Sequence, residues 1–407
     1  MGSRYDFATI GRLPGPTDNV AIAVRRIEAG TEIVYQGRAF VLSHTVLEGH
    51  RFAVMPIAAG EPLLSWGLPF GIALRDIAPG EYVCNQPMLD ELSLRHLDFP
   101  LPPAPNFRNW MTRYVLDEET FQPGTQVPRY DHERFFFGYK REGGRGVGTR
   151  NYIVILGTTA ETAGFARALA ERCQGMAAHC RQIDGIVAVT HTEGGGTRRP
   201  NNLSLLLRTL AGFMVHPNVG AILAVDFGSE PVTNQMLRQY MEEHNYPLSH
   251  VLHRFFSIEG SFQSALLQGE AIIRGWIEAV EGMRRSEQSL AHLKIALQCG
   301  GSDAFSGISG NPLAAYVTRE IIRYGGSANL AETDELIGAE PYVLQNVRDL
   351  ETARRFLQTI ERFKTWADWH GHTAEGNPSG GNKFRGLYNI AIKSLGAAMK
   401  RHPEVRL

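Results

Sequence analysis

Three glycine-rich segments of this 407-residue chain carry the side chains that are best suited to chemistry. Their sequences are HTEGGGT at 191–197, QCGGSD at 298–303 and NPSGGNK at 377–383. Glycines let backbone N–H groups approach a carboxylate or a phosphate, and the N-terminus of a following helix favours negative charge. The segments therefore predict turns that bind an anion; the alternative is that each is only a tight connection between a strand and a helix.

Individual side chains in these segments suit acid–base or metal chemistry. Histidine titrates near neutral pH, so His191, placed directly after an apolar run, is a candidate for proton transfer. Cys299 is either a metal ligand or a small buried residue, and its sequence context favours the second. His44 and His50 flank a turn near the N-terminus, where a single histidine is more often structural than functional.

Composition and better-known motifs exclude several classes of protein. The formal net charge is −1 and no apolar run is long enough to span a bilayer, so we expect neither nucleic acid nor a membrane as a partner. Four cysteines without a CxxC pair and an N-terminus without a signal pattern indicate the reducing cytoplasm. The chain has no nucleotide P-loop. The glycines at 143–148 precede an apolar strand rather than a helix, which argues against nicotinamide binding.

The elements that must position these segments fall into several parts. Residues 1–95 are strand-rich and repeat a turn of the form Ile-x-x-Gly at 27–30, 57–60 and 77–80. A glycine at a fixed place in each turn predicts a positive φ there. Residues 96–134 are rich in proline and polar groups and predict an extended linker.

From residue 135 onward, short apolar runs alternate with helical patterns, which indicates parallel sheets in a multidomain α/β fold. The expected strands are 152–157, 186–190, 221–225 and 294–298. The expected helices are 161–172, 203–213, 234–243, 263–283, 313–323, 350–363 and 387–399. We expect an α/β domain over 135–288 and, over 289–407, the start of a further α/β domain that continues beyond Leu407.

Taken in order, the motifs resemble the altronate/galactarate dehydratase family. The stretches that carry the resemblance are TDNVAI at 17–22, EGHRFAV at 48–54, GVGTRN at 146–151, HTEGGGT, QCGGSDAFSG at 298–307 and NPSGGN. The resemblance implies that residues 1–95 form a SAF-type, β-clip-like domain, followed by two α/β portions that carry the site. It also implies removal of water from a sugar acid to give a 2-keto-3-deoxy acid, and we expect a homodimer.

Such a reaction needs a base for the proton alpha to the carboxylate, an acid for the departing hydroxyl, and stabilisation of the enediolate. The resemblance implies proton transfer by His191, Asp303 and Lys383, and a divalent metal, often Fe²⁺, held by His191 and Cys299. It further implies that the substrate contacts histidines, glycines and small polar side chains, namely His44, His50, Gly194, Gly196, Gly300, Gly301, Ser302, Asn377, Ser379 and Asn382.

The sequence also departs from the family pattern. Gly195, Ser229 and Ala163 stand where cysteines are common in the family. Loss of three soft ligands together predicts altered metal binding. One alternative is therefore a changed paralogue that binds a carboxylate ligand or a partner subunit, and another is a hydrolase of unknown substrate.

Overall fold

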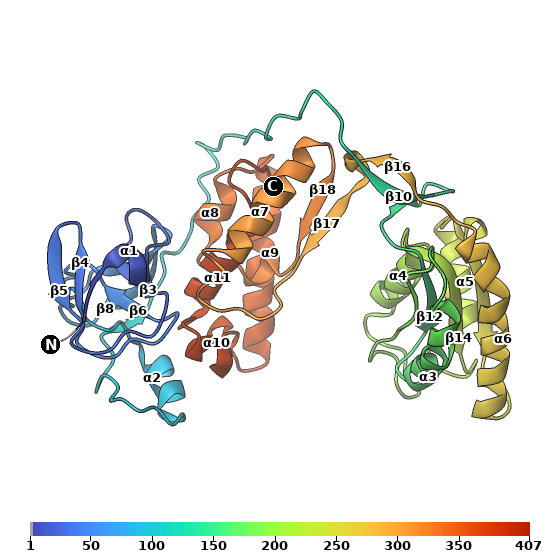
Figure 1. Cartoon of the computed structure of the whole chain (residues 1–407), viewed down its shortest axis with the longest axis horizontal. Helices are drawn as coiled ribbons and strands as arrows, with labels where there is room; N and C mark the ends of the chain where they lie inside the picture. The colour runs from blue at the N-terminus through green and yellow to red at the C-terminus, as the bar shows by residue number, and fades with distance from the viewer. Residues whose placement is uncertain (1–2) are drawn as a thin grey trace. The chain divides into compact units, whose positions relative to one another are not determined.

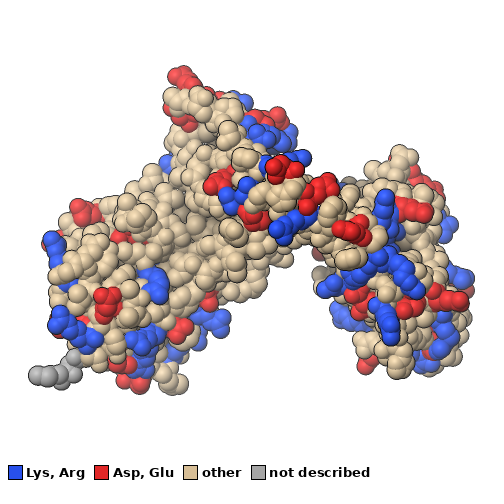
Figure 2. All heavy atoms as spheres, turned by 45° about the horizontal axis from the view of Figure 1, so that its top comes forward, with Lys and Arg blue, Asp and Glu red and all other residues tan. Residues whose placement is uncertain are grey.

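The computed structural model describes residues 3–407, and the chain divides into two compact units. The first unit comprises residues 3–131 and 294–407, and the second comprises residues 132–293. Figure 1 labels their helices and strands. Among the described residues, no helix is both long and apolar enough to cross a membrane. Figure 2 shows that acidic and basic side chains both occur on each unit.

The N-terminal part of the first unit is a β module of three small three-stranded sheets. Their orders are β1-β4-β5, β2-β3-β6 and β7-β8-β9. The bounds are β1 Arg4–Asp6, β2 Gly11–Arg12, β3 Val20–Ala23, β4 Glu32–Tyr35, β5 Arg38–Val41, β6 Arg51–Ala53, β7 Pro62–Ser65, β8 Leu68–Ala73 and β9 Phe107–Asn109. Two helices complete it, α1 (Phe7–Ile10) and α2 (Gln86–Ser93).

The repeated turns of this module share one conformation. Gly30, Gly60 and Gly80 have φ angles of 78°, 84° and 87°, which confirms the predicted positive φ. Each of these glycines donates its N–H to a backbone carbonyl of a neighbouring segment, at 2.8–2.9 Å. The repeat therefore marks equivalent corners at which a short strand of the module reverses.

The predicted linker is only partly an extended connection. Strand β9 lies inside the predicted linker and pairs with β8. Its residue Phe107 is buried in the core of the module. The linker prediction is therefore wrong for residues 107–109, and the β module extends past residue 95.

The remainder of the first unit contains two parallel strands and several helices. Strands β17 (Lys294–Leu297) and β18 (Ser327–Leu330) pair in register Leu297 to Leu330. The helices are α7 (Gly310–Arg323), α8 (Glu340–Leu344), α9 (Leu350–Trp369), α10 (Gly380–Phe384) and α11 (Ile390–Ala398). Side-chain caps begin three of them, Asp349 at α9, Ser379 at α10 and Asn389 at α11.

One hydrophobic core joins this part to the β module. Tyr388 and Ile392 are fully buried in the same cluster as Phe52, Phe70 and Phe107. The rings of Phe107 and Tyr388 are 6.2 Å apart between centroids. The β module and the C-terminal part therefore pack as one body, which the sequence did not predict.

The second unit is built on a parallel sheet in the order β13-β12-β14-β15. Its strands are β12 (Tyr152–Gly157), β13 (Gly185–Val189), β14 (Val219–Asp226) and β15 (Leu252–Ser257). Helices α3 (Ala163–Cys173) and α6 (Phe262–Glu281) cover one face, and α4 (Leu203–Met214) and α5 (Asn234–Glu243) cover the other. Alternate residues of β12 point to opposite faces, so Ile153 and Ile155 pack on one side and Val154 and Leu156 on the other.

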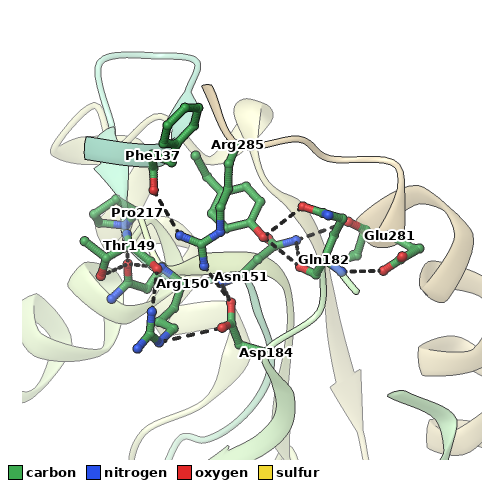
Figure 3. A network of polar contacts seen from close by, with 12 residues as sticks. Phe137, Thr149, Arg150, Asn151, Gln182, Asp184, Pro217, Glu281 and Arg285 are labelled. Atoms are coloured by element: carbon green, nitrogen blue, oxygen red, sulfur yellow. Dashed lines mark hydrogen bonds and ion pairs between the residues drawn. The ribbon is translucent and has the colours of Figure 1, made fainter. Parts of the chain in front are cut away.

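A polar network closes the amino-terminal edge of this sheet (Figure 3). The Asn151 N–H donates to Asp184 Oδ2 at 2.7 Å, and the Asn151 side chain donates to Gln182 O at 2.9 Å. Arg285 donates to the carbonyl of Phe137 at 3.0 Å, which links the antiparallel strands β10 (Phe135–Arg141) and β16 (Ser286–Ser289), and it forms an ion pair with Asp184 at 3.7 Å. A third strand, β11 (Gly146–Gly148), pairs with β10. Ligands of parallel sheets bind at the opposite, carboxyl edge, so this network is structural.

Candidate functional site

The second glycine-rich segment follows β17 and forms a loop shaped by its own polar side chains. Asp303 Oδ1 accepts hydrogen bonds from the N–H groups of Phe305 (2.9 Å) and Ser306 (2.8 Å) and from the Ser306 hydroxyl (2.9 Å). The thiol of Cys299 contacts the hydroxyl of Ser302. All three bonds to Asp303 fall on one carboxylate oxygen, so the loop orients this carboxylate firmly.

The third glycine-rich segment meets this loop directly. Asn382 Nδ2 donates to the carbonyl of Ser302 at 2.9 Å, and the N–H of Ala304 donates to the carbonyl of Arg385 at 3.0 Å. Ser379 and Asn382 also form a reciprocal capping box at the start of α10. The side chains of Ser379 and Asn382, predicted to contact substrate, therefore hold the two loops in place. Asn377 is likewise engaged, by the ammonium group of Lys393.

A turn of the β module packs against the same region. Gly49 and Gly386 approach so closely that a Cβ on Gly386 would lie 2.0 Å from the Gly49 carbonyl oxygen. Arg51 donates to the Gly386 carbonyl at 2.7 Å, and its own N–H donates to the Tyr388 hydroxyl at 2.8 Å. Burial lowers the pKa of Arg51 to about 10. The β module thus fixes the backbone of the 384–386 segment.

His50 takes part in this contact and has no accessible surface. Its Nε2 donates to the Phe384 carbonyl at 2.8 Å, and its Nδ1 accepts from the Tyr82 hydroxyl at 2.6 Å. Burial lowers its pKa to about 4, so the ring is neutral at physiological pH. The prediction that His50 contacts substrate does not fit this position, because both ring nitrogens are used and solvent is excluded. His44 is partly exposed and bonds to Ser43 at 3.0 Å.

These segments line an open pocket with a volume of about 260 Å³. It is lined by residues of the β-module turn, the second loop and the third loop, namely Leu47, Glu48, Asp303, Phe305, Phe384 and Arg385. A guanidinium group can bind a substrate carboxylate, and a carboxylate can exchange a proton with the bound molecule. The cavity thus combines an anion-binding group, Arg385, with two acidic groups, Glu48 and Asp303.

Next to this cavity, the backbone of the second loop is open. A Cβ added to Gly300 or Gly301 would have no neighbouring atom within 4 Å, and neither glycine has a positive φ. Neither close packing nor backbone conformation therefore requires glycine at these two positions. Their absent side chains leave space beside the backbone, and the binding of an anion at this turn stays a prediction.

The first glycine-rich segment belongs to the second unit, at the carboxyl edge of its sheet. His191 Nδ1 accepts from the N–H of Glu193 at 3.2 Å, and His191 Nε2 is shielded from solvent with no protein partner among the described residues. Gly194 and Gly196 have φ angles of 72° and 87°. Gly196 also donates its N–H to Glu161 at 2.9 Å. A cleft shared by His191 and the loops of the first unit stays a prediction.

The predicted metal site can be compared with the side-chain donors that lie close together in the structure. Within the described part of the chain, no three His, Cys, Asp or Glu side chains lie close enough together to hold a metal. His191 and Cys299 belong to different units, and the thiol of Cys299 is engaged with Ser302. The donor set of neither unit fits a three-ligand metal centre, and no catalytic step is derived through a metal.

Sequence reasoning missed Glu48 and Arg385. Both adjoin stretches that were singled out, since Glu48 begins EGHRFAV and Arg385 lies two residues after Lys383. Each of them directly precedes a glycine in the sequence. A charged residue next to a glycine of a turn could therefore have indicated both as site residues. Lys383 itself is partly exposed next to these residues.

Fold and site together define a class: a multidomain α/β protein in which an N-terminal β module and glycine-rich loops line a small pocket that contains acidic and basic side chains. Three family models match the chain in order. They are the altronate/galactarate dehydratase SAF domain over residues 14–90, the D-galactarate dehydratase/altronate hydrolase second domain over 138–281, and the D-galactarate/altronate dehydratase C-terminal domain over 290–406.

Whole-chain relatives agree with these matches. The chain is 30% identical to altronate dehydratase of Escherichia coli (strain K12) over 94% of its own length and 72% of that protein. It is 29% identical to altronate dehydratase of Bacillus subtilis (strain 168), with the same shares covered. It is also 25% identical to galactarate dehydratase (L-threo-forming) of E. coli, over 94% of this chain and 71% of that protein. The chain belongs to the altronate/galactarate dehydratase family.

Proposed function

We propose that this chain is a hydro-lyase that removes water from a sugar acid such as altronate or galactarate, giving a 2-keto-3-deoxy acid. Relatives named as altronate and galactarate dehydratases support the reaction class. The observation that carries the proposal is the cavity in which Asp303 and Arg385 are brought together by the Asn382–Ser302 hydrogen bond. A sugar acid presents a carboxylate to the cation and a weakly acidic C–H bond to a base.

The residues present can meet most demands of such an elimination. Arg385 and the open N–H groups of Gly300 and Gly301 would bind the substrate carboxylate and the negative charge that develops on it. Asp303 is placed to exchange a proton with the substrate, and the ammonium group of Lys383 would protonate the departing hydroxyl. His191, in the second unit, is a further candidate for proton transfer.

The test is an assay of the purified full chain against a panel of aldonic and aldaric acids, with and without added Fe²⁺, Mn²⁺ or Mg²⁺. Product is measured as 2-keto-3-deoxy acid by NMR. We expect product from at least one acid and a loss of about 10²–10⁴-fold in kcat for Asp303→Asn. The matched control is Asp349→Asn, which keeps a helix-capping side chain on α9. No product from any acid under any metal condition would refute the proposal.

A second candidate is a paralogue that binds a carboxylate ligand without turning it over. Gly195, Ser229 and Ala163 at positions where the family commonly has cysteine favour this candidate. Calorimetric binding of a sugar acid without product, and metal analysis that finds no stoichiometric metal, would distinguish it from the hydro-lyase.

A further inference from the structure

A glutamate and a buried lysine meet at the carboxyl ends of strands β17 and β18. Glu332 lies two residues after β18, and Lys400 follows the end of α11. The ammonium nitrogen of Lys400 lies 3.8 Å from Glu332 Oε2, and only 7% of the lysine side chain is exposed. A buried cation is costly without an anionic partner, so this ion pair fixes where the carboxylate lies.

The backbone of Glu332 is unusual as well. Its φ angle is +64°, in the left-handed region that favours glycine. Such a conformation is strained for a residue other than glycine and persists where the surroundings hold it in place. Here the holding contacts are the ion pair with Lys400 and a hydrogen bond in which the N–H of Cys299 donates to Glu332 Oε2 at 3.2 Å.

That hydrogen bond places Glu332 against the loop of the candidate site. Cys299 is the residue before the open glycines Gly300 and Gly301, and its thiol contacts Ser302. Ser302 is in turn bonded to Asn382. A molecule bound over the glycine backbone would therefore lie beside the carboxylate of Glu332, which keeps 29% of its side chain exposed.

Asp303, a carboxylate of the loop itself, is held through one oxygen. Its Oδ1 accepts three hydrogen bonds that shape the loop, and among the described residues no hydrogen bond engages its Oδ2. Glu332 accepts one backbone hydrogen bond and forms one ion pair, both through Oε2. Among the described residues, both of these contacts use Oε2, so Oε1 is the oxygen that remains available to accept a proton.

We infer that Glu332 is the base that removes the proton alpha to the substrate carboxylate, and that Lys400 is the residue that positions it. This inference rests on the proposed hydro-lyase function. The Glu332 carboxylate takes the proton from the alpha carbon, and the electrons of that C–H bond form the enediolate. These electrons then form the C2–C3 double bond as the hydroxyl on C3 leaves with a proton from an acid group as water. The resulting enol becomes the 2-keto-3-deoxy acid when the proton of its C2 hydroxyl is released and a proton is taken up at C3.

The experiment measures turnover, substrate binding and exchange of the alpha proton in D2O for the full chain and its variants. Glu332→Gln keeps an oxygen acceptor for the N–H of Cys299 but removes the base. We expect its kcat to fall by about 10²–10⁴-fold, with loss of alpha-proton exchange and a substrate dissociation constant within about threefold of wild type. Glu332→Asp should retain part of the exchange.

Lys400 is tested by Lys400→Met, which should lower kcat by about tenfold or more, and by Lys400→Arg, which should restore part of it. If Lys400 had only a structural role, Lys400→Met would lower the stability of the protein. It would not change the rate of alpha-proton exchange in the bound substrate. The surface control is Glu361→Gln on the exposed side of α9, which should behave as wild type.

The outcomes separate the two proposals. An active wild type beside a Glu332→Gln protein that exchanges the alpha proton at the normal rate would overturn the role of Glu332 alone. A wild type that forms no product from any acid would overturn the hydro-lyase function and the role of Glu332 with it. If Glu332→Gln fails to fold by circular dichroism, the exchange rates of Glu332→Asp and Lys400→Arg decide: wild-type rates in both would overturn the inference.

Discussion

Acidification should weaken the first unit through a single buried histidine. His50 is fully buried and neutral, because Nε2 donates to the Phe384 carbonyl and Nδ1 accepts from Tyr82. Burial lowers its pKa in the folded protein to about 4, against 6.5 for an ordinary histidine. The unfolded chain therefore binds more protons than the folded chain between these two pH values. Linkage then requires the free energy of unfolding to rise with pH across this window.

The magnitude follows from the gap between the two pKa values. It corresponds to about 3 kcal/mol of stability that is fully present above pH 6.5 and is lost as the pH falls to about 4. Replacing His50 with Gln removes the titration but keeps an amide that can donate to Phe384. Between pH 6.5 and pH 4, we expect the first unit to lose less stability in His50→Gln than in wild type. The difference between the two losses should reach up to about 3 kcal/mol.

The measurement is urea unfolding from pH 4 to pH 8 for wild type and His50→Gln. Four of the five tryptophans lie in the first unit and one, Trp276, lies in α6 of the second, so fluorescence reports mainly on the unit that contains His50. Other groups also titrate in this pH range. The quantity to compare is therefore the difference between His50→Gln and wild type in the pH dependence of the free energy of unfolding. His44→Gln, which changes a partly exposed histidine of the same module, is the control. Equal pH dependence in His50→Gln and wild type would refute the reasoning.

Three further substitutions test the packing, the open loop and the second unit. Gly386→Ala should cost at least about 2 kcal/mol, because φ is +87° and the new Cβ would lie 2.0 Å from the Gly49 carbonyl; a normal melting temperature would contradict this contact. Gly300→Ala should change stability by less than about 0.5 kcal/mol but lower kcat/KM by about tenfold or more, and unchanged kinetics would remove the loop from the site. Arg145→Met should lower the stability of the second unit by about 2–4 kcal/mol, because Arg145 donates to four backbone carbonyls at 2.8–3.1 Å. Unfolding followed through Trp276 alone, with the other tryptophans replaced by Phe, measures this loss, and Arg145→Lys should recover little of it because an ammonium lacks the planar fork.

The sequence identified those elements whose hydrophobic pattern is strong. The apolar run at 152–157 and the helical pattern at 234–243 coincide with β12 and α5. Strands β15 and β18 were missed, because LHRFFS contains charged residues and SANL is short and polar. Both strands have a paired neighbour on only one side, and such strands tolerate polar side chains. Local pattern therefore finds strands with a continuous apolar run, including the edge strands β13 and β17, better than strands with polar residues.

The site was less accessible to sequence reasoning, because it depends on contacts between distant segments. The two loops that meet through Ser302 and Asn382 are 80 residues apart in the sequence, and both were recognised from their glycines. His50 was misplaced, because a turn between short strands gives no sign that the ring will be covered by residues more than 300 positions away. Lys400 was missed for the same reason, since its only sequence context is the end of an apolar helix.

The contribution of the β module to the site is then largely indirect. Its turn supplies Leu47 and Glu48 to the cavity wall, but His50 and Arg51 act on the backbone carbonyls of Phe384 and Gly386. Those two carbonyls flank Arg385, whose own carbonyl accepts from Ala304, so the backbone that carries the guanidinium is fixed by bonds from the β module and from the second loop. The same loop is held on its other side by Asn382, which also holds Ser302. A small displacement of the module would therefore move Arg385 and the glycine loop together, and the β module is better understood as the frame of the cavity than as a separate lid.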